Sequence, residues 1–255
     1  MEIDRKIKVS LISYTNTKPF GYGLKNFPGI QDQLSIQMDS PKDCAQKLIQ
    51  DQVDLGIVPS AALLDLPYYE ILSDYCIGTL GKVNSVFLFS QIPISAIQTI
   101  YLDEESRTSN GLAQILAQKF WKINPIWKVF EANEDKFPST RILIGDRTFI
   151  GREKYPYQID LGLAWKEFTG LPFVFAVWAS NKTLDPKFIS LFNKALAFGL
   201  DHRKEVLEEI QMDPSFLPQF DYHHYLYQNL SFELNDSKRL GLETYLKYLK
   251  DLRIH

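Results

Sequence analysis

The sequence predicts an α/β protein with two lobes that face each other across a cleft. Short apolar runs typical of buried strands alternate with helical patterns, once before residue 90 and again between residues 97 and 179. Several of these runs end in small polar residues. Strands of a parallel sheet that is covered on both faces are continuous apolar runs. Ligands of such sheets bind beyond the carboxyl ends of the strands, and clefts between lobes are common ligand sites.

The first strand shows this change from apolar to polar most clearly. Residues 9–19 (VSLISYTNTKP) begin apolar and turn polar at Ser13, so Tyr14, Asn16 and Thr17 would lie at the mouth of the cleft. The alternative is an ordinary surface turn, because Asn, Thr and Pro are common turn residues.

Three later strands repeat the pattern and supply further candidate binding residues. They are Ser60 at the end of DLGIVPS, Asn84 and Ser85 before the apolar run 86–89, and Gly145 and Asp146 after the strand 141–144. Asp146 is either an acid in the pocket or a turn residue.

A polar helix start follows the strand 97–103. Arg107, Thr108 and Ser109 precede Leu112 and Ile115, which recur at helical spacing. Hydroxyls, free N–H groups and a guanidinium together can bind a carboxylate. The alternative is plain helix capping by Ser or Thr.

The order of the elements predicts the lobe boundaries. The apolar runs 86–89 and 173–179 bracket the second α/β pass, and we expect them to lie side by side as a two-stranded crossing between the lobes. One lobe would then comprise residues 1–90 and 180–255, including the C-terminal helices, and the other residues 91–179. A hinged cleft between the lobes would hold the candidate residues.

Composition excludes several other classes of protein. The 255 residues are 45% hydrophobic and 23% charged, with a net charge of -3. This charge gives no basic surface for nucleic acid or an anionic membrane. The N-terminal residues lack the apolar core of a secretory signal, and the longest apolar run is too short to span a bilayer. We therefore expect a cytoplasmic protein without nucleic-acid or membrane partners. All four histidines lie beyond residue 200, so we expect no metal and no cofactor.

Six segments resemble the menaquinone-biosynthesis dehydratase family of the futalosine route, whose members convert chorismate to 3-[(1-carboxyvinyl)oxy]benzoate and water. The segments are SYTNTKP (13–19), DLGIVPS (54–60), GKVNSVFLFS (81–90), LDEESRTSNGL (102–112), LIGDRTF (143–149) and DLGLAWKEFTGLPFVFAVWA (160–179). The resemblance implies a type 2 periplasmic-binding-protein-like fold, a carbon–oxygen lyase activity and a dicarboxylate substrate, chorismate. It also implies that Asn16 is the catalytic amide, Ser85 a pocket serine, and Thr108 and Ser109 a carboxylate-binding helix start.

The chemistry of this reaction favours substrate assistance. Loss of the ring hydroxyl, with the proton on the neighbouring ether-bearing carbon, makes the ring aromatic, so the site mainly orients and polarises the substrate. An amide is a poor base, and the predicted cleft has no histidine. We hypothesise that Asn16 acts by hydrogen bonding, that the substrate's enolpyruvyl carboxylate accepts the proton, and that a pocket hydroxyl or Asp146 assists the departure of water.

Three alternatives give different expectations. A non-catalytic solute-binding protein of the same fold would bind a small anion without forming product, and it would carry an export signal. The related enzyme that makes 1,4-dihydroxy-6-naphthoate uses a histidine in the second lobe, and residues 97–179 contain none. A regulatory ligand-binding domain would normally be joined to a DNA-binding segment, and no basic helical pair is apparent.

Overall fold

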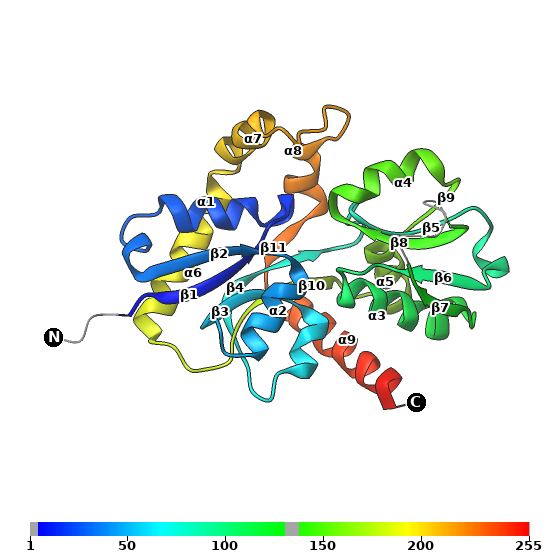
Figure 1. The fold of residues 1–255 in the computed structure, drawn as a ribbon, viewed down its shortest axis with the longest axis horizontal. Helices are drawn as coiled ribbons and strands as arrows, with labels where there is room; N and C mark the ends of the chain where they lie inside the picture. Colours follow the sequence, from blue (N-terminus) through cyan, green and yellow to red (C-terminus); the bar gives the residue numbers. More distant parts are fainter. Residues whose placement is uncertain (1–4, 131–137, 255) are drawn as a thin grey trace.

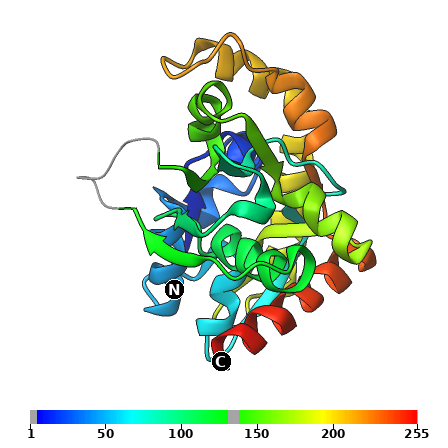
Figure 2. The same ribbon diagram turned by 90° about the vertical axis from the view of Figure 1, so that its right-hand side faces the viewer.

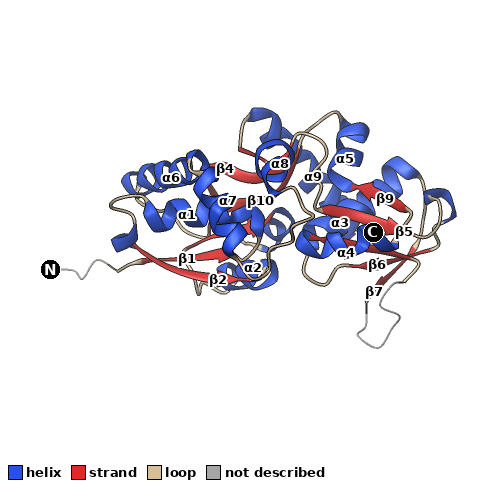
Figure 3. Ribbon diagram, turned by 90° about the horizontal axis from the view of Figure 1, so that it is seen from above, coloured by secondary structure: helices blue, strands red, loops and turns tan. Residues whose placement is uncertain are grey.

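The protein contains two β-sheets that lie side by side along its longest axis (Figures 1 and 3). The structure, a computed structural model, describes residues 5–130 and 138–254. In this part of the chain the first sheet has the strand order β11-β4-β10-β3-β1-β2 and the second β7-β6-β8-β5-β9. Helices accompany both sheets, which confirms the predicted α/β class.

The strands of the first sheet come from both ends of the chain. They are β1 (Ile7–Ile12), β2 (Leu34–Asp39), β3 (Leu55–Pro59), β4 (Glu70–Thr79), β10 (Phe173–Ser180) and β11 (Ser231–Glu233). The strands of the second sheet come from the middle of the chain. They are β5 (Val86–Ser90), β6 (Thr99–Leu102), β7 (Ile126–Val129), β8 (Thr140–Ile144) and β9 (Tyr157–Asp160).

Most α-helices begin where the sequence supplies a cap or a proline. Ser40, Ser106, Asp160 and Asp185 each accept a backbone N–H at a helix start. The α-helices are α1 (Lys18–Asn26), α2 (Pro41–Ile49), α3 (Arg107–Leu116), α4 (Thr148–Lys154), α5 (Leu161–Thr169), α6 (Pro186–Asp201), α7 (Arg203–Met212), α8 (Tyr222–His224) and α9 (Asp236–Ile254). Short 3₁₀ turns are η1 (Thr15–Thr17), η2 (Gln31–Gln33), η3 (Ser60–Asp65), η4 (Ile94–Ala96) and η6 (Gly145–Arg147), and π-helical turns are η5 (Ala117–Trp121) and η7 (Tyr225–Asn229).

Strand direction brings the polar segments to one edge of each sheet. In the first sheet β1 is parallel to β3, so both strands have their carboxyl ends at the same edge. In the second sheet β6 is parallel to β8. Because β5 is antiparallel to β8 and pairs Val86 with Ile144, Ser85 lies beside Gly145. The Gly145 N–H donates to the Ser85 carbonyl over 2.8 Å.

The predicted crossing between the lobes is wrong. The strands β5 and β10 do not pair with each other. β5 pairs with β8 and β9 in the second sheet, and β10 pairs with β3 and β4 in the first. The division of the chain at residues 90 and 179 stays a prediction. The sheet membership of these two strands favours boundaries a few residues earlier, before Val86 and before Phe173.

A buried carboxylate fastens the chain where it passes from the first sheet to the second. Asp160, at the end of β9, accepts the backbone N–H groups of Val83 and Asn84 over 3.2 and 2.7 Å. It also accepts the Leu163 N–H at the start of α5. One side chain thus caps a helix and fixes the connecting segment that precedes Ser85.

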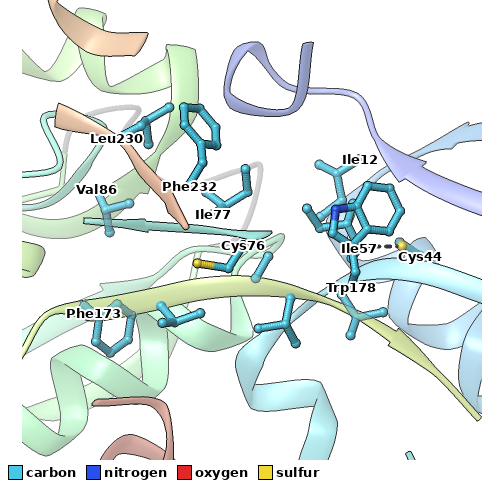
Figure 4. Close-up of a cluster of buried hydrophobic side chains, with 14 of the residues drawn as sticks. Ile12, Cys44, Ile57, Cys76, Ile77, Val86, Phe173, Trp178, Leu230 and Phe232 are labelled. Atoms are coloured by element: carbon cyan, nitrogen blue, oxygen red, sulfur yellow. Dashed lines mark hydrogen bonds between the residues drawn. The ribbon is translucent and has the colours of Figure 1, made fainter. Parts of the chain in front are cut away.

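The hydrophobic core is continuous between the two sheets. Trp178 on β10 and Ile57 on β3 lie in its first-sheet part, and Val86 on β5 in its second-sheet part (Figure 4). A smaller cluster made of Phe87, Phe89, Leu143 and Tyr155 packs separately.

The first sheet with its helices is called the first unit below, and the second sheet with its helices the second unit. The C-terminal part of the chain contacts both units. In Figure 2 it runs from the orange segment at the top of the view to α9, in red, at the bottom. Phe220 packs on Phe149 of α4, with ring centroids 4.1 Å apart, and the Tyr245 hydroxyl of α9 donates to the Thr108 carbonyl over 3.0 Å. The C-terminal chain therefore supports the second unit as well as the first.

Candidate functional site

A pocket lies between the two sheets, at the strand ends just described. It encloses about 570 Å³ of space between atoms, counting the part that is open to solvent. It is lined by Ile12, Tyr14, Asn16, Thr17, Pro41, Pro59, Ile77, Val83, Ser85, Val86, Ser106, Thr108, Ser109, Ile144, Gly145, Phe175, Ala176 and Leu230. The structure therefore brings together the predicted residues Tyr14, Asn16, Thr17, Ser85, Thr108, Ser109 and Gly145.

The first wall is the turn that follows β1. The hydroxyl of Thr17 donates to the Tyr14 carbonyl over 2.8 Å and also to the Ile12 carbonyl. These bonds close the 3₁₀ turn and hold Asn16 at its centre. Thr17 is thus fixed by backbone contacts, while Asn16 has a partly exposed side chain at the pocket.

The second wall contains Ser85 and Gly145. The Ser85 hydroxyl lies 2.9 Å from the hydroxyl of Tyr225. Gly145 has φ +59°, a left-handed conformation that suits glycine. Its Cα faces the Tyr14 ring, because a Cβ built there would lie 3.9 Å from two ring carbons.

The third wall is the N-terminus of α3. Ser106 caps the helix by accepting the Ser109 N–H over 3.2 Å, and its own hydroxyl donates to Ser109 Oγ over 2.7 Å. Thr108 Oγ1 accepts the Ala61 N–H of η3 over 3.1 Å. The first backbone N–H groups of an α-helix have no partner within the helix, and they carry the positive end of its dipole. This wall can therefore bind an anion, and capping and binding are compatible here.

The pocket lining contains amides, hydroxyls and apolar groups but no ionisable acid or base other than tyrosine among the described residues. Burial, followed by the hydrogen bond to Glu105, raises the pKa of Tyr14. Burial also raises the pKa of Tyr225. Both phenols therefore stay protonated at neutral pH.

Two predicted residues have structural roles outside the pocket. The Ser60 hydroxyl is fully buried and donates to the Val174 carbonyl of β10 over 2.7 Å. Asn84 has φ +63° and accepts hydrogen bonds from Arg152 at its carbonyl and its side chain, over 2.7 and 2.9 Å. Neither residue is among those that line the pocket, and their assignment to substrate binding stays a prediction.

Two further predicted residues also lie outside the pocket lining. Arg107 turns away from it and pairs with Asp65 over 2.5 Å. Asp146 faces a neighbouring groove that Lys18 also lines, and its carboxylate lies 3.5 Å from the Thr15 hydroxyl. Burial raises the pKa of Asp146. Of the two interpretations of Asp146, its absence from the described lining favours a turn residue over an acid in the pocket.

Tyr14 also links the two units across the pocket. Its hydroxyl donates to the Glu105 carboxylate, which lies after β6 in the second unit. Arg147 contacts both Glu105, at 3.3 Å, and the buried carboxylate of Asp103, at 2.9 Å. Arg147 and Asp103 thus form an ionic cluster with Glu105, the hydrogen-bond partner of Tyr14.

The sequence interpretation missed Tyr225 and Phe175. Phe175 lies in the apolar run 173–179 and was indistinguishable from a core aromatic, and Tyr225 lies in the segment 221–230, which showed no site motif. The polar helix start that pointed to Thr108 and Ser109 also contains Ser106.

The described residues contain no group of three His, Cys, Asp or Glu side chains arranged to hold a metal ion. Every helix in the described ranges is too short or too polar to pass through a bilayer.

Solved structures with the same fold include periplasmic binding proteins. A protein of Archaeoglobus fulgidus has a TM-score of 0.75 and 15% identity over the whole of both chains. A Candida albicans protein that exhibits the generic periplasmic binding protein fold has a TM-score of 0.67 and 13% identity, over 97% of this chain and 90% of that one. The alkanesulfonate-binding protein of Xanthomonas axonopodis pv. citri, solved with MOPS, has a TM-score of 0.64 and 12% identity, over 98% and 92%. These likenesses confirm the predicted periplasmic-binding-protein-like fold.

Sequence comparison identifies the family. A chorismate dehydratase of Thermus thermophilus is 27% identical over 271 residues, which cover 96% of each chain. A chorismate dehydratase of Campylobacter jejuni is 23% identical over 261 residues, which cover 95% of this chain and 97% of that one. The sequence model of the menaquinone biosynthesis family matches residues 7–251. The chain therefore belongs to the menaquinone biosynthesis family, as the resemblance in its motifs predicted.

Proposed function

We propose that this protein is a chorismate dehydratase that forms 3-[(1-carboxyvinyl)oxy]benzoate and water in menaquinone biosynthesis by the futalosine route, in the cytoplasm. The observation that carries this proposal is the meeting of Asn16, Ser85 and the α3 start at Thr108 and Ser109 in one pocket. The relatives named above supply the reaction, and the pocket supplies groups suited to it.

The two carboxylates of chorismate would occupy different environments. The N-terminus of α3 offers N–H groups and the hydroxyls of Thr108 and Ser109 to the ring carboxylate. The enolpyruvyl carboxylate would lie near Asn16, among apolar side chains such as Ile77 and Val86. A carboxylate that loses hydration becomes a stronger base, because burial disfavours its charged form.

The proposed reaction requires no basic side chain. The enolpyruvyl carboxylate takes the proton from the ether-bearing ring carbon, those electrons form the new ring double bond, and the carbon–oxygen bond to the ring hydroxyl breaks. The departing hydroxide takes that proton from the enolpyruvyl carboxylic acid and leaves as water, which restores the carboxylate, and the ring becomes aromatic. Asn16 holds the reacting carboxylate and ring in place, and a pocket hydroxyl such as that of Ser85 hydrogen-bonds the departing oxygen. Asp146 does not line the described pocket, so a hydroxyl is the better candidate for this assistance.

Mixing the purified protein with chorismate tests the proposal. The ultraviolet spectrum should change to that of a substituted benzoate, and mass spectrometry should show a product lighter by one water. An unchanged spectrum with bound chorismate would instead indicate a solute-binding protein of the same fold.

Variants of Asn16 test its role. Removing one preorganised amide from a reacting centre costs about 10²–10³ in kcat, so we expect Asn16→Ala to lose activity on this scale. Asn26→Ala is the matched control, because Asn26 is an exposed asparagine of α1. Asn16→Asp should also be impaired, since it places a negative charge beside the substrate carboxylate.

A substrate analogue tests the origin of the base. A chorismate analogue without the side-chain carboxylate should bind at the α3 end but fail to dehydrate. Full turnover of this analogue would refute the substrate-assisted step, while leaving the dehydratase activity itself established.

A further inference from the structure

The strand β10 contains an extra residue where it borders the pocket. Its register against β4 pairs Val174 with Gly78. The next pair is Ala176 with Ile77, so Phe175 is left over and forms a β-bulge. Phe175 is partly exposed, whereas the rest of β10 is buried, and it lines the pocket together with its neighbour Ala176. Adjacent residues of a regular strand point to opposite faces, and a bulge departs from this alternation and redirects a side chain.

A buried serine holds the chain just before the bulge. The strand β3 pairs with β10 as far as Pro59, opposite Ala176, and a proline has no N–H group to donate to the ladder. The next residue, Ser60, is fully buried, and its hydroxyl donates to the Val174 carbonyl over 2.7 Å. A side chain thus supplies a donor to β10 at the point where β3 ends. Ser60 therefore fixes the peptide group that leads into Phe175.

Short contacts connect Phe175 to the start of α3. The Ala61 N–H of η3 donates to Thr108 Oγ1 over 3.1 Å, so the turn that holds the bulge also holds this helix. The ring centroids of Phe173 and Phe175 are 4.7 Å apart, and Phe173 packs edge-on against Tyr245 at 5.1 Å. The Tyr245 hydroxyl in turn donates to the Thr108 carbonyl over 3.0 Å. Phe175 is therefore joined by two routes to the wall that can bind an anion.

We propose that Phe175 is a specificity-determining residue that contacts the ring of a cyclic dicarboxylate, and that Ser60 is a positioning residue that holds the bulge. A carboxylate bound at Thr108 and Ser109 would bring the group attached to it beside Phe175. The ring carboxylate of chorismate is bonded directly to the ring, so the ring would lie against this side chain. Contacts between an aromatic side chain and a flat ring are worth about two- to ten-fold in affinity. The orientation of chorismate rests on the proposed function, whereas the preference for a ring does not.

Two dicarboxylate probes test this preference without any reaction. The compound 3-(carboxymethoxy)benzoate carries its carboxylates on an aromatic ring, and adipate carries them on a flexible chain. In calorimetry the native protein should bind the ring compound more tightly. Phe175→Leu should weaken binding of the ring compound by about two- to ten-fold, with a smaller effect on adipate. A native protein without the preference, or an equal loss for both probes, would overturn the proposal.

Phe168→Leu is the matched control for this substitution. Phe168 of α5 is also a partly exposed phenylalanine, and its ring packs on Phe120 with centroids 5.6 Å apart. It is not among the residues that line the described pocket. Binding of the ring compound should therefore be unchanged in Phe168→Leu. Equal losses in Phe168→Leu and Phe175→Leu would mean that Phe175 acts only through general packing.

A double-mutant cycle tests the role of Ser60. Ser60→Ala should reduce the preference for the ring compound to about the same extent as Phe175→Leu. In the Phe175→Leu background it should have no further effect on this preference, since no aromatic ring is left to position. Two losses of preference that multiply would overturn the positioning role.

Ser180→Ala is the matched control for Ser60→Ala. Ser180, at the other end of β10, is also fully buried, and its hydroxyl donates to the Asp54 carbonyl over 2.7 Å. Each variant loses a buried hydroxyl that donates to a backbone carbonyl, so both should lose similar stability. Only Ser60→Ala should change the preference between the two probes. An equal change in both variants would mean that Ser60 is merely structural.

Kinetics with chorismate separate this proposal from the proposed function. Phe175→Leu should raise KM by about two- to ten-fold, as for the ring compound. A protein that prefers the ring compound through Phe175 but does not convert chorismate would refute only the dehydratase assignment. Turnover of chorismate with a KM that Phe175→Leu leaves unchanged would overturn the role of Phe175 and leave the dehydratase assignment standing.

Discussion

The hydrogen bond between Tyr14 and Glu105 offers a direct test of how the two units cooperate. Tyr14 follows β1 of the first sheet, and Glu105 follows β6 of the second, so the bond crosses the pocket. Tyr14→Phe removes the donor and leaves the ring in place beside Gly145. The bond joins the two walls of the pocket and does not join a wall to the substrate. We therefore expect it to stabilise the arrangement of the two units seen here, in which the pocket would hold chorismate.

The structure limits the size of this effect. Hydrogen bonds to charged groups contribute about 1.5–3 kcal/mol when they are well shielded. The side chains of Glu105 and Arg147 are 43% and 42% exposed, so water competes for the carboxylate and the full figure does not apply. We expect about 1 kcal/mol, which is about a five-fold increase in KM for chorismate, with kcat little changed.

Steady-state kinetics with a matched pair of substitutions measure the effect. Tyr68→Phe is the control, because Tyr68 also donates to a glutamate, Glu70, but within the first unit and at the surface. In a cycle with Glu105→Gln, the effect of Tyr14→Phe should shrink. An unchanged KM in Tyr14→Phe, or an equal change in Tyr68→Phe, would refute the argument that this bond stabilises the substrate-holding state.

Substitutions at three further residues test packing, electrostatics and capping. A Cβ on Gly199 would lie 1.9 Å from the Pro19 carbonyl oxygen, so Gly199→Ala should lower the free energy of unfolding by about 1–3 kcal/mol in urea melts, despite its better helix propensity. Burial raises the pKa of Asp146, so the native chain loses stability as pH rises from the ordinary Asp pKa through the raised one. Asp146→Asn should therefore be the more stable protein at pH 7, and its advantage should vanish below about pH 3.5 in melts at both pH values. Ser106→Ala should cost about 1 kcal/mol of stability by loss of the α3 cap. Ser106→Asp should keep the cap but raise KM, because its charge repels a dicarboxylate.

The sequence was informative about burial and element type because both leave local patterns. The apolar runs at β1, β3, β5 and β10 are strands in the structure. The pairing of β5 with β10 was predicted wrongly because their composition reports only that each is buried. Which sheet a buried strand joins depends on contacts with distant segments, such as β8 for β5. The helix α4 was also missed, since it is short and contains Gly151, which packs closely against Phe89.

The candidate site was predictable where strand ends and helix starts determine position. Asn16, Ser85 and Thr108 satisfy that condition and line the pocket. The direction of the Arg107 side chain was not predictable, because the first residue of a helix can direct a long side chain toward either side. Here the side chain pairs with Asp65, outside the pocket. Tyr225 was beyond prediction, since its part in the site arises only from its distance to Ser85 in the folded chain.

The composition of the pocket leads to a prediction for the pH dependence of the proposed reaction. Among the described lining residues, Tyr14 is the group that titrates, and Tyr225 lies next to the lining residue Ser85. Burial raises the pKa of both phenols above the usual value. Carboxylates of the substrate ionise at about pH 4, well below neutrality. We therefore expect kcat/KM for chorismate to be constant between about pH 6 and pH 9, because no described lining residue and no carboxylate of the substrate changes its charge there. Activity should fall only on the acid side, where the proton-accepting carboxylate is itself protonated.

Measuring initial rates across this range in buffers of constant ionic strength checks the expectation. A bell-shaped profile with a pKa near 7 would mean that an enzyme group acts as the base, and the substrate-assisted step would have to be abandoned.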